Sequence, residues 1–128
     1  MKKTLIIIAL LIPMIFVTGC TDDIYNEVME EYQNEQREKY TFVDEPEILT
    51  EGDDFFAIEY IVGTLKNESG KKTKYIQIVF NLYDEDGNVI GSAMDNINNI
   101  DPDGTWRFKA MILDDDFASF ELSEITGF

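Results

Sequence analysis

Two short acidic runs are the residues of this sequence best suited to binding a ligand. They occupy positions 84–86, in the stretch "YDEDGN", and positions 114–116, near the C-terminus. Carboxylate oxygens are the ligands that Ca²⁺ prefers in proteins. If the two runs meet at one end of a sheet, the candidate metal ligands are Asp84, Asp86, Asp114, Asp115 and Asp116.

A turn explains the first acidic run without any ligand. Asp86-Gly87, or Gly87-Asn88, between two alternating runs predicts a hairpin turn, because Asp, Asn and Gly adopt positive φ at little steric cost. The glycine also follows the acids too closely for an EF-hand loop, which places it at the sixth position. The alternative to a calcium site is therefore a solvated loop end that aids solubility.

The N-terminus has the features of an export signal. Lys2 and Lys3 precede an apolar run of thirteen residues from Leu5 to Val17, and "VTGC" ends at Cys20. "VTGC" resembles the lipobox of bacterial lipoproteins, which implies cleavage before Cys20 and diacylglycerol on its sulfur. As a helix the run spans about 20 Å, short of the roughly 30 Å of bilayer hydrocarbon. The alternative is an uncleaved anchor helix that ends in a free thiol, and both interpretations predict membrane attachment.

Composition and charge exclude several classes of function. The 128 residues include 10 basic and 26 acidic side chains, no histidine and one cysteine. Removal of residues 1–19 would leave eight basic residues and a net charge of −18, which excludes nucleic-acid binding. Without histidine, the chain has no Ser-His-Asp triad, Cys-His pair or histidine-containing zinc site.

Residues 20–40 are interpreted as a lipid-anchored acidic stalk. Ile24, Val28 and Tyr32 recur every four residues, which predicts that the first half of this segment is helical. From "YQNEQREKY" onward there is no sustained apolar face, so the second half is interpreted as a spacer. Alternatively, the apolar stripe docks on a partner or on the sheet of the following domain.

Alternation with a period of two predicts antiparallel strands from residue 54 onward. The runs cover 54–65, 73–84, 88–94, 105–113 and 119–126, with a further strand predicted within 41–49. Turn residues separate them, and "DPDG" at 101–104 predicts a type I turn. Short antiparallel strands at this spacing predict an all-β fold, a small β-sandwich.

The alternation also assigns side chains to faces. In 73–84 one face carries Ile76, Ile78, Phe80 and Leu82, and in 105–113 one face carries Trp106, Phe108, Ala110 and Ile112. In 54–65 one face carries Phe56, Ile58, Tyr60 and Val62, with Glu59 on the other. These apolar faces are the predicted sides of the core. Trp106 is assigned to the core, with a sugar-stacking surface as the alternative.

The segment "FNLYD" at 80–84 matches the motif of the FxLYD domain, a small immunoglobulin-like β-sandwich of bacterial lipoproteins and envelope proteins. "VGTLKNESGKK", "YDEDGNVIGS" and "MDNINNIDPDGTWRFKA" extend the resemblance over residues 55–126. The resemblance implies an immunoglobulin-like β-sandwich. With the export signal and the stalk, the chain is interpreted as three parts: a signal peptide at 1–19, the stalk at 20–40, and the FxLYD-like β-sandwich at 41–128. The family has no generally assigned activity, so the resemblance implies a fold and not a function.

The function expected from these features is that of a non-catalytic binding or accessory module. An envelope protein is the expected partner, and Tyr75 and Tyr83, on the mixed face of their strand, are candidate contacts. No catalytic or cofactor-binding residue is predicted, and Glu59 is the single acid considered for carboxylate catalysis. Four lysines at the opposite end suggest an anionic envelope polymer as a further ligand: Lys66, Lys71, Lys72 and Lys74.

Overall fold

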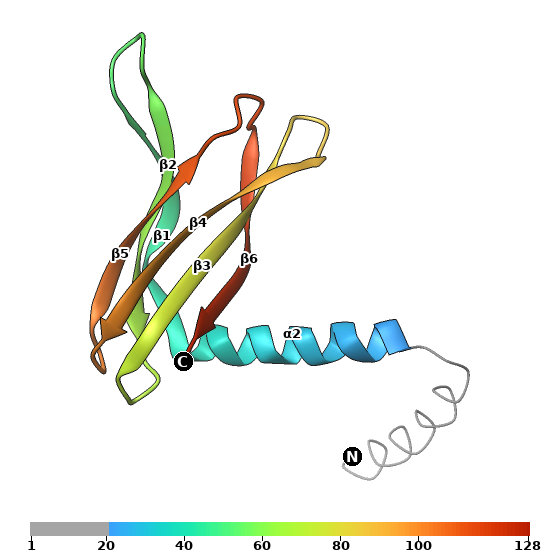
Figure 1. Ribbon diagram of the computed structural model, residues 1–128, viewed down its shortest axis with the longest axis vertical. Helices are drawn as coiled ribbons and strands as arrows, with labels where there is room; N and C mark the ends of the chain where they lie inside the picture. The colour runs from blue at the N-terminus through green and yellow to red at the C-terminus, as the bar shows by residue number, and fades with distance from the viewer. Residues whose placement is uncertain (1–20) are drawn as a thin grey trace, which may run out of the picture. The chain divides into compact units, whose positions relative to one another are not determined.

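The computed structural model describes residues 21–128, which form one helix followed by six strands (Figure 1). The elements are helix α2 (Thr21–Lys39) and strands β1 (Tyr40–Glu51), β2 (Ile58–Asn67), β3 (Thr73–Tyr83), β4 (Val89–Ile100), β5 (Thr105–Ile112) and β6 (Ser119–Gly127). The predicted signal peptide and the predicted lipidation site, Cys20, lie outside the described residues.

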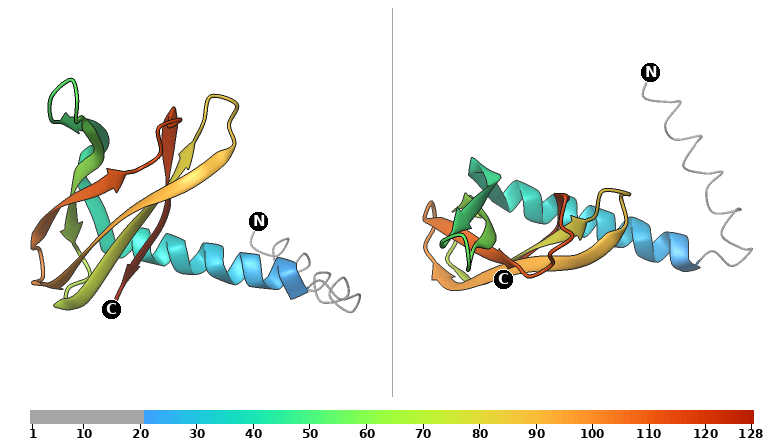
Figure 2. Two further views of the ribbon diagram at one scale, coloured as in Figure 1. Left: turned by 45° about the horizontal axis from the view of Figure 1, so that its top comes forward. Right: turned by 90° about the horizontal axis from the view of Figure 1, so that it is seen from above.

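The strands form two three-stranded sheets. One has the order β1-β2-β5 and the other the order β4-β3-β6, and every paired neighbour is antiparallel. Side chains from both sheets meet in one core, so the sheets face each other (Figure 2). The prediction of a small antiparallel sandwich is confirmed. The further strand predicted within 41–49 is also present, as β1.

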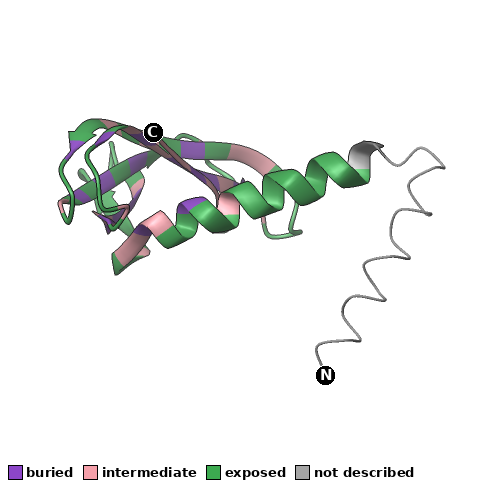
Figure 3. Ribbon diagram, turned by 90° about the horizontal axis from the view of Figure 1, so that it is seen from below, coloured by how far each residue is buried: buried purple, intermediate pink, exposed green. Residues whose placement is uncertain are grey.

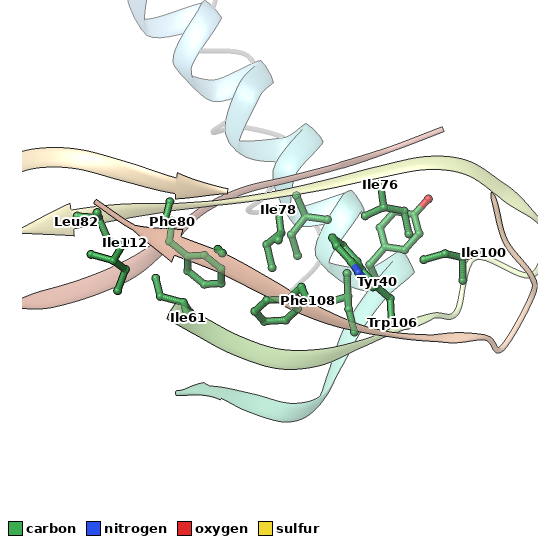
Figure 4. Packing of buried hydrophobic residues seen from close by; sticks show 14 residues of the cluster. Tyr40, Ile61, Ile76, Ile78, Phe80, Leu82, Ile100, Trp106, Phe108 and Ile112 are labelled. Atoms are coloured by element: carbon green, nitrogen blue, oxygen red, sulfur yellow. The ribbon is translucent and has the colours of Figure 1, made fainter. Parts of the chain in front are cut away.

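The core follows the predicted alternation of β3 and β5. These strands contribute eight side chains to the core cluster, each at most 7% exposed: Ile76, Ile78, Phe80, Leu82, Trp106, Phe108, Ala110 and Ile112. The rings of Phe80 and Phe108 lie 5.7 Å apart between centroids and join the two sheets (Figure 4). Trp106 is 6% exposed and packs edge-on against Phe108, so it belongs to the core.

Strand β2 presents the opposite face to the core from the one predicted. Ile61 and Leu65 are fully buried in the core cluster, whereas the predicted face contributes no member of that cluster. Between them Gly63 lies under the Phe108 ring, where a β-carbon would come within 2.6 Å of Cζ. Because Tyr60, Ile61 and Val62 are all apolar, alternation alone did not distinguish the two faces.

The C-terminal half of α2 continues as a helix to Lys39 and contacts the edge strand β6. Gln33 Oε1 accepts a hydrogen bond from the Ile125 N–H at 2.9 Å, and Gln36 Oε1 accepts one from the Gly127 N–H at 3.1 Å. Gln36 is 3% exposed. Figure 3 shows α2 as mostly exposed, with buried and intermediate positions toward its C-terminal end. The segment interpreted as a spacer therefore covers backbone groups of a sheet edge.

Residues 21–32 belong to a compact unit separate from residues 33–128. They form the N-terminal part of α2, as the four-residue recurrence predicted. The apolar side chains of this segment are all exposed: Ile24, Tyr25, Val28, Met29 and Tyr32.

Asn67, at the end of β2, joins two turns through its buried side chain. It is 1% exposed, and its Nδ2 donates to the carbonyl oxygens of Lys71, Ile100 and Asp101 at 2.9 to 3.2 Å. Its Oδ1 accepts from the backbone N–H and the hydroxyl of Ser69. The β2–β3 and β4–β5 turns are thus fixed to each other by one amide.

The β4–β5 turn differs from the predicted type I geometry. The Gly104 N–H donates to the Asp101 carbonyl at 2.9 Å, which closes the four-residue turn. Asp103, the third residue, has φ of 63°, in the left-handed region. A type I turn has negative φ at that position, whereas a type II turn has positive φ. The third residue of "DPDG" is therefore an aspartate where glycine is the usual choice.

Candidate functional site

Three loops lie at one end of the sandwich, at the top of Figure 1: residues 52–57, 84–88 and 113–118. Glu59 pairs with Ile112, so the first and third loops leave adjacent strands at the same end. We call this region the acidic loop end, because its loops contain eight carboxylates and no lysine or arginine: Asp53, Asp54, Asp84, Glu85, Asp86, Asp114, Asp115 and Asp116.

The predicted hairpin turn is present between β3 and β4, and Asp84 organises it. Asp84 Oδ1 accepts hydrogen bonds from the N–H groups of Asp86 and Asn88 at 3.0 and 2.9 Å. The Gly87 N–H donates to the Asp84 carbonyl, and Gly87 has φ of 82°. This is a three-residue loop with a left-handed glycine at its end. Asp84 therefore has a structural role that needs no cation.

The β5–β6 loop is tied to the end of β3 and to the core. The Ala118 N–H donates to the Tyr83 carbonyl at 2.8 Å, and Phe117 packs against the core cluster. The Asp114 carboxylate lies directly over Gly91 of β4, where a β-carbon would collide with Oδ2. The Asp114 side chain is therefore directed at β4.

The two acidic runs meet around a depression of about 480 Å³. The residues that line it are Asp84, Glu85, Asp86, Asp115, Asp116 and Phe117. The structure thus brings together four of the five candidate ligands and leaves Asp114 aside. Within residues 21–128, no three ligating side chains converge closely enough to form a metal-binding group. The calcium site stays a hypothesis, and the Asp84 hydrogen bonds favour its alternative, a turn in a solvated loop end.

Phe55 and Phe56 project from the β1–β2 loop, with 89% and 81% of their surface exposed. The sequence had placed both in the first predicted strand, which was wrong, because β2 begins only at Ile58. Asp53 Oδ1 accepts from both phenylalanine N–H groups at 3.0 Å, and Gly52 has φ of 116°. The turn residues "EGDD" were the signal that a loop extends this far.

Two further exposed apolar side chains lie beside the phenylalanines. Ile58 follows the loop and is 41% exposed. Leu113 is 80% exposed. It follows Ile112, which pairs with Glu59, the residue after Ile58, so Leu113 and Ile58 lie at the same end of the paired strands β5 and β2. We call this group the aromatic tip: Phe55, Phe56, Ile58 and Leu113. Sequence reasoning missed it, because these residues appeared as parts of strands.

The carboxylates of the acidic loop end form no ion pair with any residue of the described range, 21–128. In the described part of the chain, the ion pairs are Glu35 with Lys39, Glu68 with Lys66, and Glu51 with Lys109, and none involves the acidic loop end. The bond from Lys109 to Glu51, 2.5 Å long, raises the pKa of the Lys109 ammonium. Lys109 also lies 4.2 Å above the Tyr60 ring.

The candidate partner contacts Tyr75 and Tyr83 are both half-buried and lie at opposite ends of β3. Eight positions of a strand separate them, about 26 Å at roughly 3.3 Å per residue. The Tyr75 hydroxyl donates to Gln77 Oε1 at 2.6 Å, and its ring lies 5.6 Å from that of Phe128. Tyr75 therefore holds the C-terminus, while Tyr83 adjoins the acidic loop end.

Glu59 is exposed on the sandwich, and the lysines of the opposite end are exposed or half-buried. Glu59 pairs across the sheet with Thr50 and Ile112 and stands in solvent, not in an apolar pocket. Lys66 contacts Glu68 at 3.7 Å. The other lysines of that end are exposed: Lys71, Lys72 and Lys74.

Among residues 21–128, no helix is long and apolar enough to cross a membrane.

Comparison with known proteins gives one partial likeness. An archaeal protein of Methanocaldococcus jannaschii, described as uncharacterized protein MJ0360, is 36% identical over 50 residues. The match covers 39% of this chain and 37% of that protein. No family model and no solved structure matches the chain. The likeness assigns neither a family nor an activity.

Proposed function

We propose that this protein is an extracytoplasmic lipoprotein whose β-sandwich acts as a non-catalytic binding or accessory module for an envelope protein. The proposal for its location rests on the order of Lys2, Lys3, the apolar run and "VTGC". Two acyl chains on Cys20 would hold a small domain at the bilayer firmly, because each buried methylene contributes about 0.8 kcal/mol.

We further propose that the sandwich is immunoglobulin-like and related to the FxLYD domain. In immunoglobulin-like domains strands A, B and E share one sheet, and C′, C and F share the other. The orders β1-β2-β5 and β4-β3-β6 correspond to these sheets if the strands are taken in sequence as A, B, C, C′, E and F. The "FNLYD" segment then occupies the end of strand C and the start of the turn that follows it.

The observation that carries the binding role is the exposure of Phe55 and Phe56 on an ordered loop. Aromatic side chains are common anchors of protein interfaces, and two adjacent rings in water cost solvation free energy. A catalytic role has less support, because the chain has no histidine and Glu59 is exposed. These features favour a binding role over a catalytic role.

Chemical crosslinking in intact cells tests this role. Cells that express the full chain, or the Cys20→Ser variant, are treated with a lysine-reactive crosslinker and the products are identified by mass spectrometry. We expect one envelope protein to dominate the products of the full chain and to disappear with Cys20→Ser. Scattered products of equal yield from both chains would contradict a binding module that acts at the membrane.

A further inference from the structure

We propose that the aromatic tip and the acidic loop end form one docking surface for a basic protein that offers an apolar pocket. This inference rests on the proposed binding function and specifies the chemistry of the partner. It follows from three properties of the same end of the sandwich: exposed rings, a rigid loop, and carboxylates that form no ion pair within residues 21–128.

The rings are presented by a loop that is already ordered. The Asp53 carboxylate accepts the N–H groups of both Phe55 and Phe56, and the Phe56 N–H also approaches the Asp53 carbonyl at 3.2 Å. Gly52 leaves no room for a side chain, because a β-carbon there would collide with the Phe56 carbonyl oxygen. Binding therefore costs little loop ordering, which is a main cost of association.

The apolar part of the surface suits an anchor that enters a pocket. Phe55 and Phe56 are adjacent, and Ile58 and Leu113 extend the exposed apolar surface beside them. Interface energy is concentrated in a few aromatic anchors surrounded by residues that exclude water. A convex pair of rings requires a concave apolar site on the partner.

The negative charge around the rings indicates that the contacting surface of the partner is positively charged. Asp53 and Asp54 directly precede Phe55, and the other six carboxylates of the acidic loop end come from the two neighbouring loops. None takes part in an ion pair of the described chain. A partner surface rich in lysine or arginine would form ion pairs with these carboxylates. Attraction between the opposite charges would also raise the rate of association.

The same charge disfavours two other occupants of the tip. Anionic lipid would be repelled by carboxylates that flank the rings, within a Debye length of roughly 8 to 10 Å. A second copy that met this one tip to tip would bring sixteen carboxylates together, since each loop end carries eight. A basic protein is the occupant that satisfies both the apolar and the charged parts of the surface.

Photocrosslinking in cells tests the docking surface in the full, anchored chain. The photoreactive phenylalanine analogue p-benzoylphenylalanine replaces Phe55, where it preserves the ring, or Lys72 at the opposite end as the positional control. We expect position 55 to crosslink to one protein, at a peptide that contains apolar residues and lysine or arginine. Position 72 should give no such product.

Two matched pairs of substitutions separate the apolar and charged contributions. Phe56→Ser should reduce the crosslink from position 55 by roughly tenfold or more, whereas Val43→Ser, which removes an exposed apolar side chain near the other end of β1, should not. The double substitution Asp115→Asn and Asp116→Asn should also reduce the crosslink from position 55. The control, Asp101→Asn with Asp103→Asn in the β4–β5 turn, should leave the crosslink unchanged.

Several outcomes would overturn the inference. Crosslinks from position 55 to lipid would identify a membrane contact, and crosslinks to the chain itself would identify self-association. A partner peptide without basic residues, or a yield unaffected by Phe56→Ser, would refute the proposed chemistry, as would the absence of any product. Loss of the product in Cys20→Ser cells with the tip intact would instead report on anchoring, which distinguishes the two proposals.

Discussion

Gln36 of the helix and Gly127 of the last strand are joined by a hydrogen bond of 3.1 Å, from the Gly127 N–H to the side-chain carbonyl oxygen. With the bond from Ile125 to Gln33, it satisfies two N–H groups of an edge strand. Unpaired strand edges are sites of unwanted pairing with other chains. The C-terminal end of α2 therefore contributes to the stability of the sandwich.

Replacement of Gln36 by alanine should lower the free energy of unfolding by about 1 to 3 kcal/mol, because a half-buried N–H loses its acceptor. Urea unfolding followed by tryptophan fluorescence measures this change, since Trp106 is the one tryptophan and lies in the core. Asn34→Ala, at an exposed position of the same helix, is the control. Equal stability of the two variants would show that the bond contributes nothing.

Asn67→Ala should destabilise the sandwich by about 2 to 4 kcal/mol, because it leaves the acceptors of two turns unpaired in a buried position. Asn67→Asp should recover only part of this loss, since a carboxylate keeps the acceptor for Ser69 but has no N–H to donate. Asn98→Ala, exposed on β4, should have little effect. Thermal unfolding measures all three, and an unaffected Asn67→Ala variant would refute this role.

Asp84→Ala should lower stability by roughly 0.5 to 2 kcal/mol, because the N–H groups of Asp86 and Asn88 lose a charged acceptor. The loss should be the same in EDTA and in millimolar Ca²⁺, and Ca²⁺ should leave the melting temperature of the full chain unchanged. Asp115→Ala, a variant of the same acidic loop end, is the control. A calcium-dependent rise in melting temperature that Asp115→Ala removes would instead establish a calcium site.

Asp103→Gly should raise stability by a few tenths to about 1 kcal/mol, since Asp103 has φ of 63° and glycine adopts that region without steric cost. The gain is limited, because glycine also adds freedom to the unfolded chain. Asp101→Gly, in the first position of the same turn, should lower stability. Chemical denaturation of both variants measures the difference, and a loss with Asp103→Gly would contradict the type II geometry.

The sequence predicted the parts of the fold that depend on long, regular alternation. Strands β3 and β5 each place four alternate apolar positions in the core, so their faces were assigned correctly. The face of β2 was assigned wrongly because Gly63 occupies a core position without a side chain, and Phe108 fills that space from another strand. The sequence of one strand does not show which side chain of another strand fills the space above a glycine.

The candidate site was predictable only in part, for related reasons. That the acidic runs meet follows from antiparallel connectivity, whereas the orientation of Asp114 over Gly91 depends on a contact between distant segments. Phe55 and Phe56 continue an alternating apolar pattern, so no local signal separated them from the strand except the preceding turn residues. Likewise, the glutamines of α2 contact β6 through hydrogen bonds, which a search for apolar faces does not detect.

We propose that the chain acts outside the cytoplasm from a lipid anchor on Cys20, and metabolic labelling with palmitate tests this proposal most directly. We expect the full chain to carry the label in the membrane fraction. The Cys20→Ser variant should carry none and should accumulate as a precursor that retains residues 1–19. Label that persists in Cys20→Ser, or an unlabelled full chain in the cytoplasm, would contradict the claim.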